Sequence, residues 1–259
     1  MADTVDLNAD LGEGFGDWRK GDDEALMSIV TSANIACGFH AGDPVTMART
    51  LRLAKARGVG IGAHPGFDDL RSFGRRRILG MDAEELRSMI VYQIGALVGL
   101  ARAEGTAVRH VKLHGALSNM ACEDEALSRI CVEAVQRLDP SLIFVATSAT
   151  ALERAAVTQK ARYVSEVYAD RAYMSDGTLA PRSQPGSVLH DPAEIADRVA
   201  RMLQEREVIS IQGKPVRLDP RTICVHGDNP EALGIAEKLR KRIEDEGFRF
   251  EPFGLPDPR

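Results

Sequence analysis

Short runs of apolar residues alternate along the chain with longer stretches in which apolar positions recur at helical spacing. The short runs predict β-strands, and the longer stretches predict α-helices. The connections between the runs are too long for hairpins, so we expect the strands to be parallel. Seven strands favour a β/α barrel, closed or incomplete, over a doubly wound sheet. The predicted strands are residues 5–10, 29–37, 59–64, 108–114, 142–146, 163–168 and 222–226.

Helices are expected between most of these strands, and some carry clear start signals. Asp43 followed by Pro44 is typical of an N-cap and first helical residue, and Asp82 predicts another N-cap. Residues 208–218 predict a small hairpin, and 248–253 a last short strand. Residues 171–190 form a long loop rich in Gly, Pro and Ser, which is usually functional or mobile. The predicted helices are 44–57, 82–104, 124–138, 150–156, 191–206 and 230–246.

Composition limits the class of protein. The 259 residues contain no repeat or linker, so we expect a single β/α barrel domain over residues 1–259. The net charge of -5 argues against a nucleic acid or an anionic membrane as partner. The four cysteines show no CxxC or disulfide spacing, and the start of the chain is unlike a signal peptide. These features predict a cytoplasmic protein with reduced thiols, and they leave a homo-oligomer open.

Residues capable of chemistry gather where the predicted strands end. In an α/β barrel all these ends open on one face, where catalytic groups collect. A single histidine there is more often structural, but four of the six histidines lie at the ends of predicted strands. We therefore predict an active site on this face. Its candidate residues are Asn8, Asp10, His40, His64, Lys112, His114, Glu166, Asp170, Arg171, His226 and Asp228.

Two kinds of chemistry suit these side chains. Asp10, His64 and His114 offer two imidazoles and a carboxylate, a set that can bind a divalent metal and activate water. The same three groups can instead bond to one another without a metal, and the residues alone leave this open. Lys112 and Arg171 suit a carboxylate or phosphate, although each can also pair with an acidic neighbour.

Neither glycine-rich segment is a nucleotide fingerprint. In residues 12–16 the spacing fails because Asp17 occupies the last glycine position of a Rossmann motif. Gly213-Lys214 is followed by Pro215 instead of Ser or Thr and falls in the predicted hairpin. If ATP is used, we expect a partner to bind it, or a binding mode outside these motifs.

Six segments together resemble the LamB/YcsF family, the A-subunit proteins of bacterial 5-oxoprolinase. They cover nearly the whole chain in the family's order, as residues 6–16, 34–44, 62–66, 111–117, 166–173 and 226–230. The chain departs from the family's usual pattern at Leu113, at Ser118 and in the loop from Phe67 to Asp69. These changes leave the ionisable residues in place, so they bear on loop shape and substrate fit more than on chemistry.

The resemblance implies a seven-stranded barrel similar to the glycoside hydrolase/deacetylase superfamily. It also implies ATP-dependent opening of 5-oxo-L-proline to L-glutamate in complex with B and C subunits. On this hypothesis Asp10, His64 and His114 activate water, directly or through a divalent metal as in the superfamily's deacetylases. Lys112 and Arg171 bind the substrate carboxylate or phosphorylated oxygen. The pocket is shaped by Asn8, His40, Glu166, Asp170, His226 and Asp228.

Two other functions keep the same residues. A stand-alone metal-dependent amidase or sugar deacetylase would need no ATP. A non-catalytic subunit would hold the lactam while its partners perform the chemistry. The production of glutamate with and without ATP and partners separates these functions.

Overall fold

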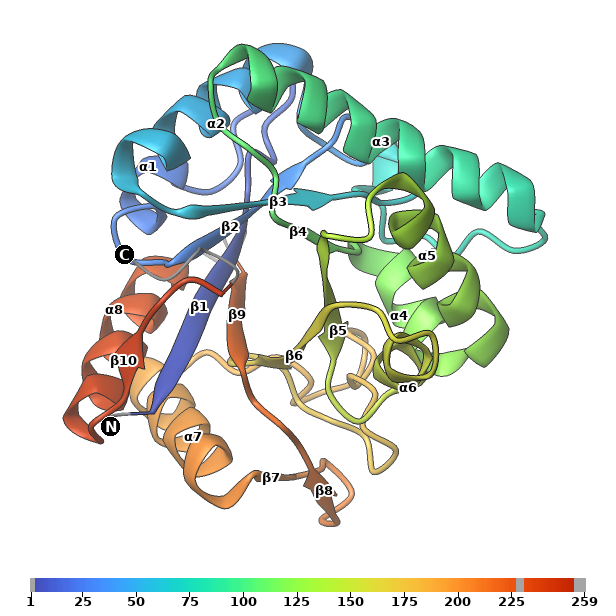
Figure 1. Ribbon diagram of the computed structural model, residues 1–259. Helices are drawn as coiled ribbons and strands as arrows, with labels where there is room; N and C mark the ends of the chain where they lie inside the picture. Colours follow the sequence, from blue (N-terminus) through green and yellow to red (C-terminus); the bar gives the residue numbers. More distant parts are fainter. Residues whose placement is uncertain (1–2, 227–230, 254–259) are drawn as a thin grey trace.

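Seven parallel strands close into a barrel in the computed structural model, which describes residues 3–226 and 231–253 (Figure 1). Each strand pairs with the next along the chain, and the last pairs with both the sixth and the first. This confirms the predicted barrel and shows that it is closed. Its strands are β1 (Thr4–Leu11), β2 (Ser32–Ala36), β3 (Gly60–His64), β4 (His110–Lys112), β5 (Ile143–Thr147), β6 (Tyr163–Tyr168) and β9 (Thr222–His226).

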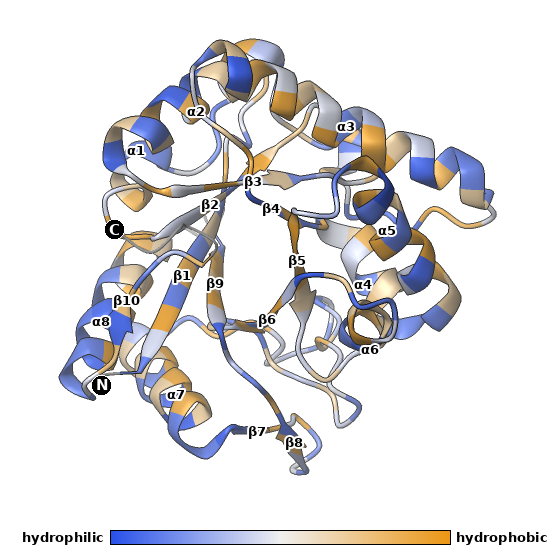
Figure 2. Ribbon diagram, viewed as in Figure 1, coloured by the Kyte–Doolittle hydropathy of each residue, from blue (hydrophilic) through white to orange (hydrophobic). Residues whose placement is uncertain are grey.

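Helices surround the barrel and turn their apolar faces toward it (Figure 2). As predicted, Asp43 and Asp82 accept hydrogen bonds from backbone N–H groups of the first turns that follow them, and Pro44 begins its helix. Gly58, at a φ of 67°, ends that helix in the left-handed conformation that glycine tolerates. The long helices are α2 (Pro44–Arg57), α3 (Ala83–Ala103), α5 (Glu125–Leu138), α7 (Pro192–Glu205) and α8 (Ala232–Asp245).

Several predicted boundaries were wrong. Ile29 and Val30 precede β2 instead of starting it, because they are buried in the turn that follows the short helix α1 (Asp23–Leu26). The fourth strand is shorter than predicted, and the residues after it form α4 (Gly115–Glu123), a helix that the hydrophobic pattern did not indicate. The 3-10 turn η1 (Leu70–Ser72) follows β3, and the helix α6 (Ala151–Thr158) follows β5.

The predicted hairpin and last strand are both present. β7 (Glu207–Ile209) pairs antiparallel with β8 (Pro215–Arg217), so Gly213 and Lys214 lie in a hairpin turn and not in a phosphate loop. The strand β10 (Arg249–Phe250) is shorter than predicted and adds to the edge of β1. None of the helices in the described residues is both long and apolar enough to cross a membrane.

The interior of the barrel is polar at its centre, and β1 shows why. Alternate residues of a strand face opposite sides. Asp6, Asn8 and Asp10 turn inward and hydrogen-bond to side chains of other strands. The intervening residues Leu7 and Ala9 pack in the apolar core. A carboxylate or amide buried in a barrel needs a partner on another strand, so this polar column links the strands and leads upward to the face where they end.

Candidate active site

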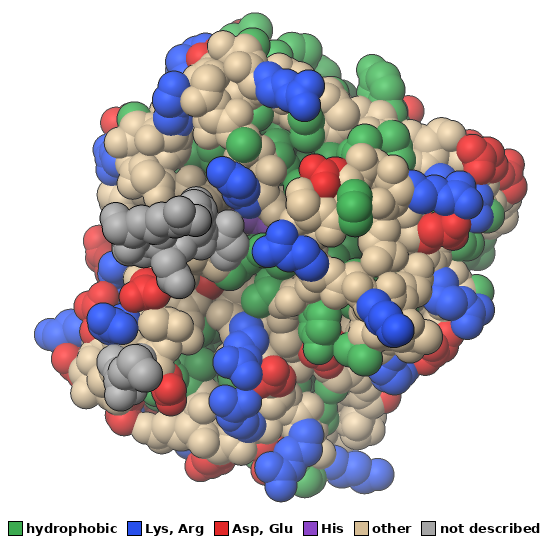
Figure 3. Space-filling model, in the orientation of Figure 1, with side chains coloured by type: hydrophobic (Ala, Val, Ile, Leu, Met, Phe, Trp, Pro, Cys, Tyr) green, Lys and Arg blue, Asp and Glu red, His purple; other side chains and the backbone are tan. Residues whose placement is uncertain are grey.

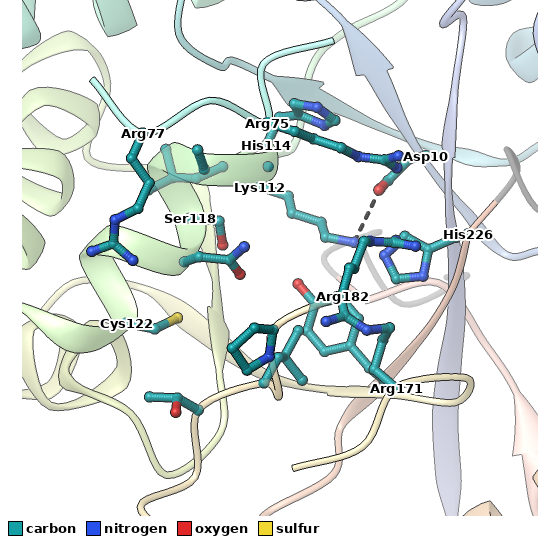
Figure 4. A pocket seen from close by; sticks show the side chains of 18 of the residues that line it. Asp10, Arg75, Arg77, Lys112, His114, Ser118, Cys122, Arg171, Arg182 and His226 are labelled. Carbon is teal, nitrogen blue, oxygen red and sulfur yellow. Dashed lines mark hydrogen bonds and ion pairs between the residues drawn. The ribbon is translucent and has the colours of Figure 1, made fainter. Parts of the chain in front are cut away.

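A cavity of about 360 Å³ opens at the carboxyl ends of the barrel strands (Figure 4). The strand ends place charged and imidazole side chains on its floor, while α4 and the loop of residues 171–190 form its walls. Figure 3 shows Lys and Arg side chains around the centre of this face, with a histidine visible between them. The predicted site residues that line the cavity are Asp10, His64, Lys112, His114, Arg171 and His226.

Lys112 is surrounded by acceptors, and with them it forms what we call the lysine group (Asn8, Asp10, Lys112, Glu166 and Cys224). Its Nζ lies 3.0 Å from Asp10 Oδ1 and 2.9 Å from Glu166 Oε1. It also lies 3.3 Å from Asn8 Oδ1 and 2.9 Å from Cys224 Sγ. An ammonium has three protons, so these four acceptors occupy it fully.

The charges of the lysine group fix its protonation. Burial alone would lower the pKa of Lys112, but the negative groups around it, Asp10 foremost, hold that pKa well above its usual value. Burial would likewise raise the pKa of Asp10, but the positive charges of His64 and Lys112 keep it well below its usual range. Lys112 is therefore a fixed cation and Asp10 a fixed anion, so Lys112 is not a general base.

The hydrogen bonds of two histidines define their tautomers. His64 Nδ1 donates to the backbone oxygen of Lys112 at 2.8 Å, and His114 Nε2 donates to the backbone oxygen of Phe73 at 2.8 Å. Carbonyl oxygens only accept, so both of these nitrogens carry the proton. The other two nitrogens, His64 Nε2 and His114 Nδ1, then face each other at 3.0 Å.

Asp10 adds a third lone-pair atom to this meeting point. Its Oδ2 lies 3.3 Å from His64 Nε2, while its Oδ1 accepts from Lys112 and from Asn34. Lone pairs so close repel unless a proton or a cation lies among them. Burial and the neighbouring His64 lower the pKa of His114 well below its usual value, which disfavours a proton on that ring. A proton on His64 Nε2, shared with Asp10 Oδ2 and His114 Nδ1, satisfies the three atoms, and a divalent cation among them does so equally.

The remaining predicted residues lie behind the cavity wall. His40 is fully buried, with its ring stacked on His114 at 3.6 Å between ring centroids. Asp170 is also buried and accepts from His226 Nδ1 at 2.9 Å, which orients that ring toward the cavity. Asn8 and Glu166 sit beneath the ammonium of Lys112. Asp228 lies outside the described residues.

Comparisons with known proteins identify the family over nearly the whole chain. The model of the LamB/YcsF family matches residues 5–256. The chain belongs to the LamB/YcsF family. It is 50% identical to a Bradyrhizobium diazoefficiens protein that is named as a 5-oxoprolinase A subunit, over 96% of this chain and 98% of that one.

Two solved structures bear on the fold of this LamB/YcsF protein. The lactam utilization protein of Thermus thermophilus is 43% identical, with a TM-score of 0.90 over 96% of this chain and all of that one. A family 4 carbohydrate esterase from Streptomyces lividans is 10% identical, with a TM-score of 0.50 over 96% and 91% of the two chains. The second likeness concerns the fold alone and agrees with the predicted deacetylase-like barrel.

Arginines line the cavity of the LamB/YcsF chain above its floor (Figure 4). Arg171 is only 4% exposed, and its guanidinium donates to the backbone oxygens of Ala180 and Ser187. None of the described residues forms an ion pair with it. Burial and the nearby charge of Arg182 lower the pKa of Arg171. A buried cation beside like charges favours an anionic ligand.

Some of the residues that line this cavity were not predicted from the sequence. Arg75 belongs to the basic run Arg75-Arg76-Arg77, where the clustered charge is itself a signal for an anion contact near a cleft. Arg182 had no such signal, because it lies within the loop of residues 171–190 and far from any strand end. Glu13 was hidden in the glycine-rich segment, although it lines the cavity near the histidines.

Proposed function

We propose that this chain is the A subunit of an ATP-dependent 5-oxoprolinase, which opens 5-oxo-L-proline to L-glutamate with hydrolysis of ATP to ADP and phosphate. The B and C subunits would complete the enzyme and bind the ATP. The observation that carries the proposal is the convergence of Asp10, His64 and His114 at the floor of an arginine-lined cavity. The names of the relatives in Bradyrhizobium and Thermus support the same lactam chemistry.

The chemistry needs activation of a poor electrophile. Transfer of phosphate to the lactam oxygen makes the ring carbon attackable by water. The ring nitrogen then leaves with a proton as the new amine, and a second water hydrolyses the resulting acyl phosphate to glutamate and phosphate. Each attack needs a positioned proton acceptor, which is the role of general-base catalysis. His64 Nε2 is the nitrogen at the cavity floor that would take such a proton, and ionised Asp10, 3.3 Å away, stabilises the positive charge that the proton brings there.

A divalent cation fits the same three donors. Asp10, His64 and His114 would hold it, and such an ion lowers the pKa of a bound water. The protein residues keep their own tasks in either case. The backbone carbonyls of Lys112 and Phe73 orient the two imidazoles so that His64 Nε2 and His114 Nδ1 face the cavity floor, and Lys112 keeps Asp10 ionised.

The cationic part of the cavity suits the substrate's negative groups. Arg171, Arg75 and Arg182 lie above the reacting floor and would bind the carboxylate of 5-oxoproline or its phosphorylated oxygen (Figure 4). A guanidinium can bond a carboxylate or phosphate through two parallel N–H groups. His226, held by Asp170, offers its free ring edge to the same space.

The test is glutamate formation from 5-oxoproline by the chain alone, by the chain with its B and C partners, and by that complex without ATP. We expect glutamate only with all three proteins and ATP. Activity of the isolated chain without ATP would overturn the proposal in favour of an amidase. Full activity of a complex carrying His64→Gln or His114→Gln would identify a non-catalytic binding subunit instead.

A further inference from the structure

His40 is a fully buried imidazole without a hydrogen bond. Neither its Nδ1 nor its Nε2 has a partner among the described residues, although its exposure is 0%. A buried polar group left without a partner costs about 1–3 kcal/mol, so a site of this kind calls for a ligand. Its Nε2 faces the carboxylate of Glu13, at 3.8 Å from Oε1.

Glu13 brings this imidazole into the same cluster as the other histidines. Its Oε1 lies 3.7 Å from His114 Nδ1, the nitrogen whose lone pair faces His64 Nε2. One ligand atom from each of Glu13, His40, His64 and His114 lies within 4.8 Å of the others. Three imidazoles and one carboxylate thus converge from the loops after β1 and β2 and from the ends of β3 and β4.

The backbone around these rings is shaped to admit them. A Cβ on Gly66 would lie 2.9 Å from His40 Nδ1, and a Cβ on Gly74 would lie 2.8 Å from both His40 Cβ and His114 Cδ2. Gly74 also has a φ of 62°, which strains any other residue. Two glycines therefore leave the space that the stacked pair of His40 and His114 fills.

We infer that Glu13, His40, His64 and His114 form a four-residue centre for a divalent transition metal, which we call the histidine group. The inference rests on the proposed function in taking this cavity as the active site, and it changes the ligand set from the expected three residues. Asp10 then lies at the margin of the centre, because its Oδ1 already bonds to Lys112 and Asn34.

The chemistry of the donors selects the metal. Imidazole nitrogens suit zinc, cobalt, nickel, copper and iron, whereas magnesium and calcium prefer oxygen ligands. Three histidines and one carboxylate are a ligand set that zinc and cobalt accept. The histidine group should therefore bind Zn²⁺ and Co²⁺ far more tightly than Mg²⁺. A bound ion lies in the plane of each imidazole, so the His40 ring would turn out of its stack on His114 when the ion binds.

Metal binding to the isolated full chain tests this without any assay of activity. After treatment with a chelator, we expect one equivalent of Co²⁺ to bind, with visible ligand-field bands that Zn²⁺ then removes. Glu13→Gln and His40→Gln should each raise the apparent Kd for Co²⁺ at least about tenfold, the lower end of losses seen when even outer partners of a metal site are removed. His40→Phe keeps a ring stacked on His114 but removes both ring nitrogens. It should therefore fold normally and still lose affinity for Co²⁺.

Matched controls come from the same chain. His190→Gln changes an exposed histidine, and Glu123→Gln removes a carboxylate that lines the cavity outside the histidine group. Neither should change the Kd. The inference is overturned if no metal binds, or if Asp10→Asn abolishes binding while folded Glu13→Gln and His40→Gln variants bind normally. If metal binding fails, glutamate formation by the complete complex in the presence of a chelator would show that the proposed function still holds.

Discussion

The lysine group and the histidine group lie side by side at and behind the floor of one cavity, yet their side chains are satisfied in opposite ways. Around Lys112, one cation meets two carboxylates and further acceptors, so every proton of the ammonium is used. Around His64, two ring nitrogens lie 3.0 Å apart and the neighbouring His40 lacks any hydrogen bond among the described residues. Asp10 touches both groups through its two oxygens.

This difference suggests that the lysine group stabilises the fold and that the histidine group carries binding and catalysis. A fully compensated buried network can hold its neighbours in place without a ligand. A cluster of imidazole nitrogens and carboxylate oxygens is stable only when a proton or a cation lies among them. We therefore expect changes in the lysine group to reduce stability, and changes in the histidine group to reduce binding and catalysis. Four predictions test this contrast, from the largest effect to the smallest.

Lys112→Met should have the largest effect on stability. It leaves Asp10 and Glu166 buried near each other without their shared cation, and breaking a buried ion pair costs about 3–5 kcal/mol. Urea unfolding at pH 7 measures the loss. Adding Glu166→Gln to the variant should recover part of it, because one uncompensated charge is removed. A loss below about 1 kcal/mol would show that Lys112 does not support the barrel interior.

His64→Gln should chiefly affect catalysis. Loss of a positioned acid–base or metal-binding group reduces rates by about a hundredfold or more, so kcat of the reconstituted complex should fall by at least that factor. The free energy of unfolding should change less than in Lys112→Met. His190→Gln, at an exposed position, serves as control. An unchanged kcat would remove the histidine group from the reaction.

Arg182→Gln should weaken substrate binding. Arg182 is exposed at the cavity and carries a charge that is not needed to hold the floor together. We expect KM for 5-oxoproline to rise about tenfold, the equivalent of one charge-assisted hydrogen bond, with a smaller change in kcat. Arg201→Gln removes another exposed arginine, from α7, and should leave KM unaltered. Equal KM values for both variants would contradict the anion-binding role.

Asp6→Asn tests the foot of the polar column below the lysine group. Burial raises the pKa of Asp6 from 3.8 to about 6, against the effect of hydrogen bonds from Ser32, Thr222 and Thr31. The folded state therefore favours protonated Asp6. Its contribution to stability is complete below about pH 4 and is lost as pH rises through 6.

The variant lacks this titration, so its stability relative to the wild type should rise by about 1 kcal/mol between pH 5 and 7.5. Urea unfolding at the two pH values gives the difference. Asp43→Asn provides the control, because hydrogen bonds lower the pKa of Asp43 to about 2 and it does not titrate in this window. A pH-independent difference for Asp6→Asn would contradict the raised pKa.

Much of the fold could be predicted because its signals are local. Asp43 and Asp82 mark helix starts through bonds to residues two or three positions ahead. The helix α4 was missed because no such signal precedes it, since His114 stands at its N-cap without a side-chain hydrogen bond. Ile29 and Val30 were wrongly assigned to the second strand because an apolar run indicates burial. It does not reveal which of its residues hydrogen-bond to a neighbouring strand.

The sequence by itself determined that chemistry lies where the strands end, because parallel strands bring Asp10, His64, Lys112 and His226 to one face. Only the tertiary structure decided which of these residues contact one another. Lys112 meets Glu166 across 54 positions of the sequence, and Glu13 reaches His40 from another loop. Which carboxylate neutralises a lysine and which faces a histidine depends on distances of a few ångströms across the barrel. Charge interactions fall off on that scale in a buried site, and no local pattern in the sequence records it.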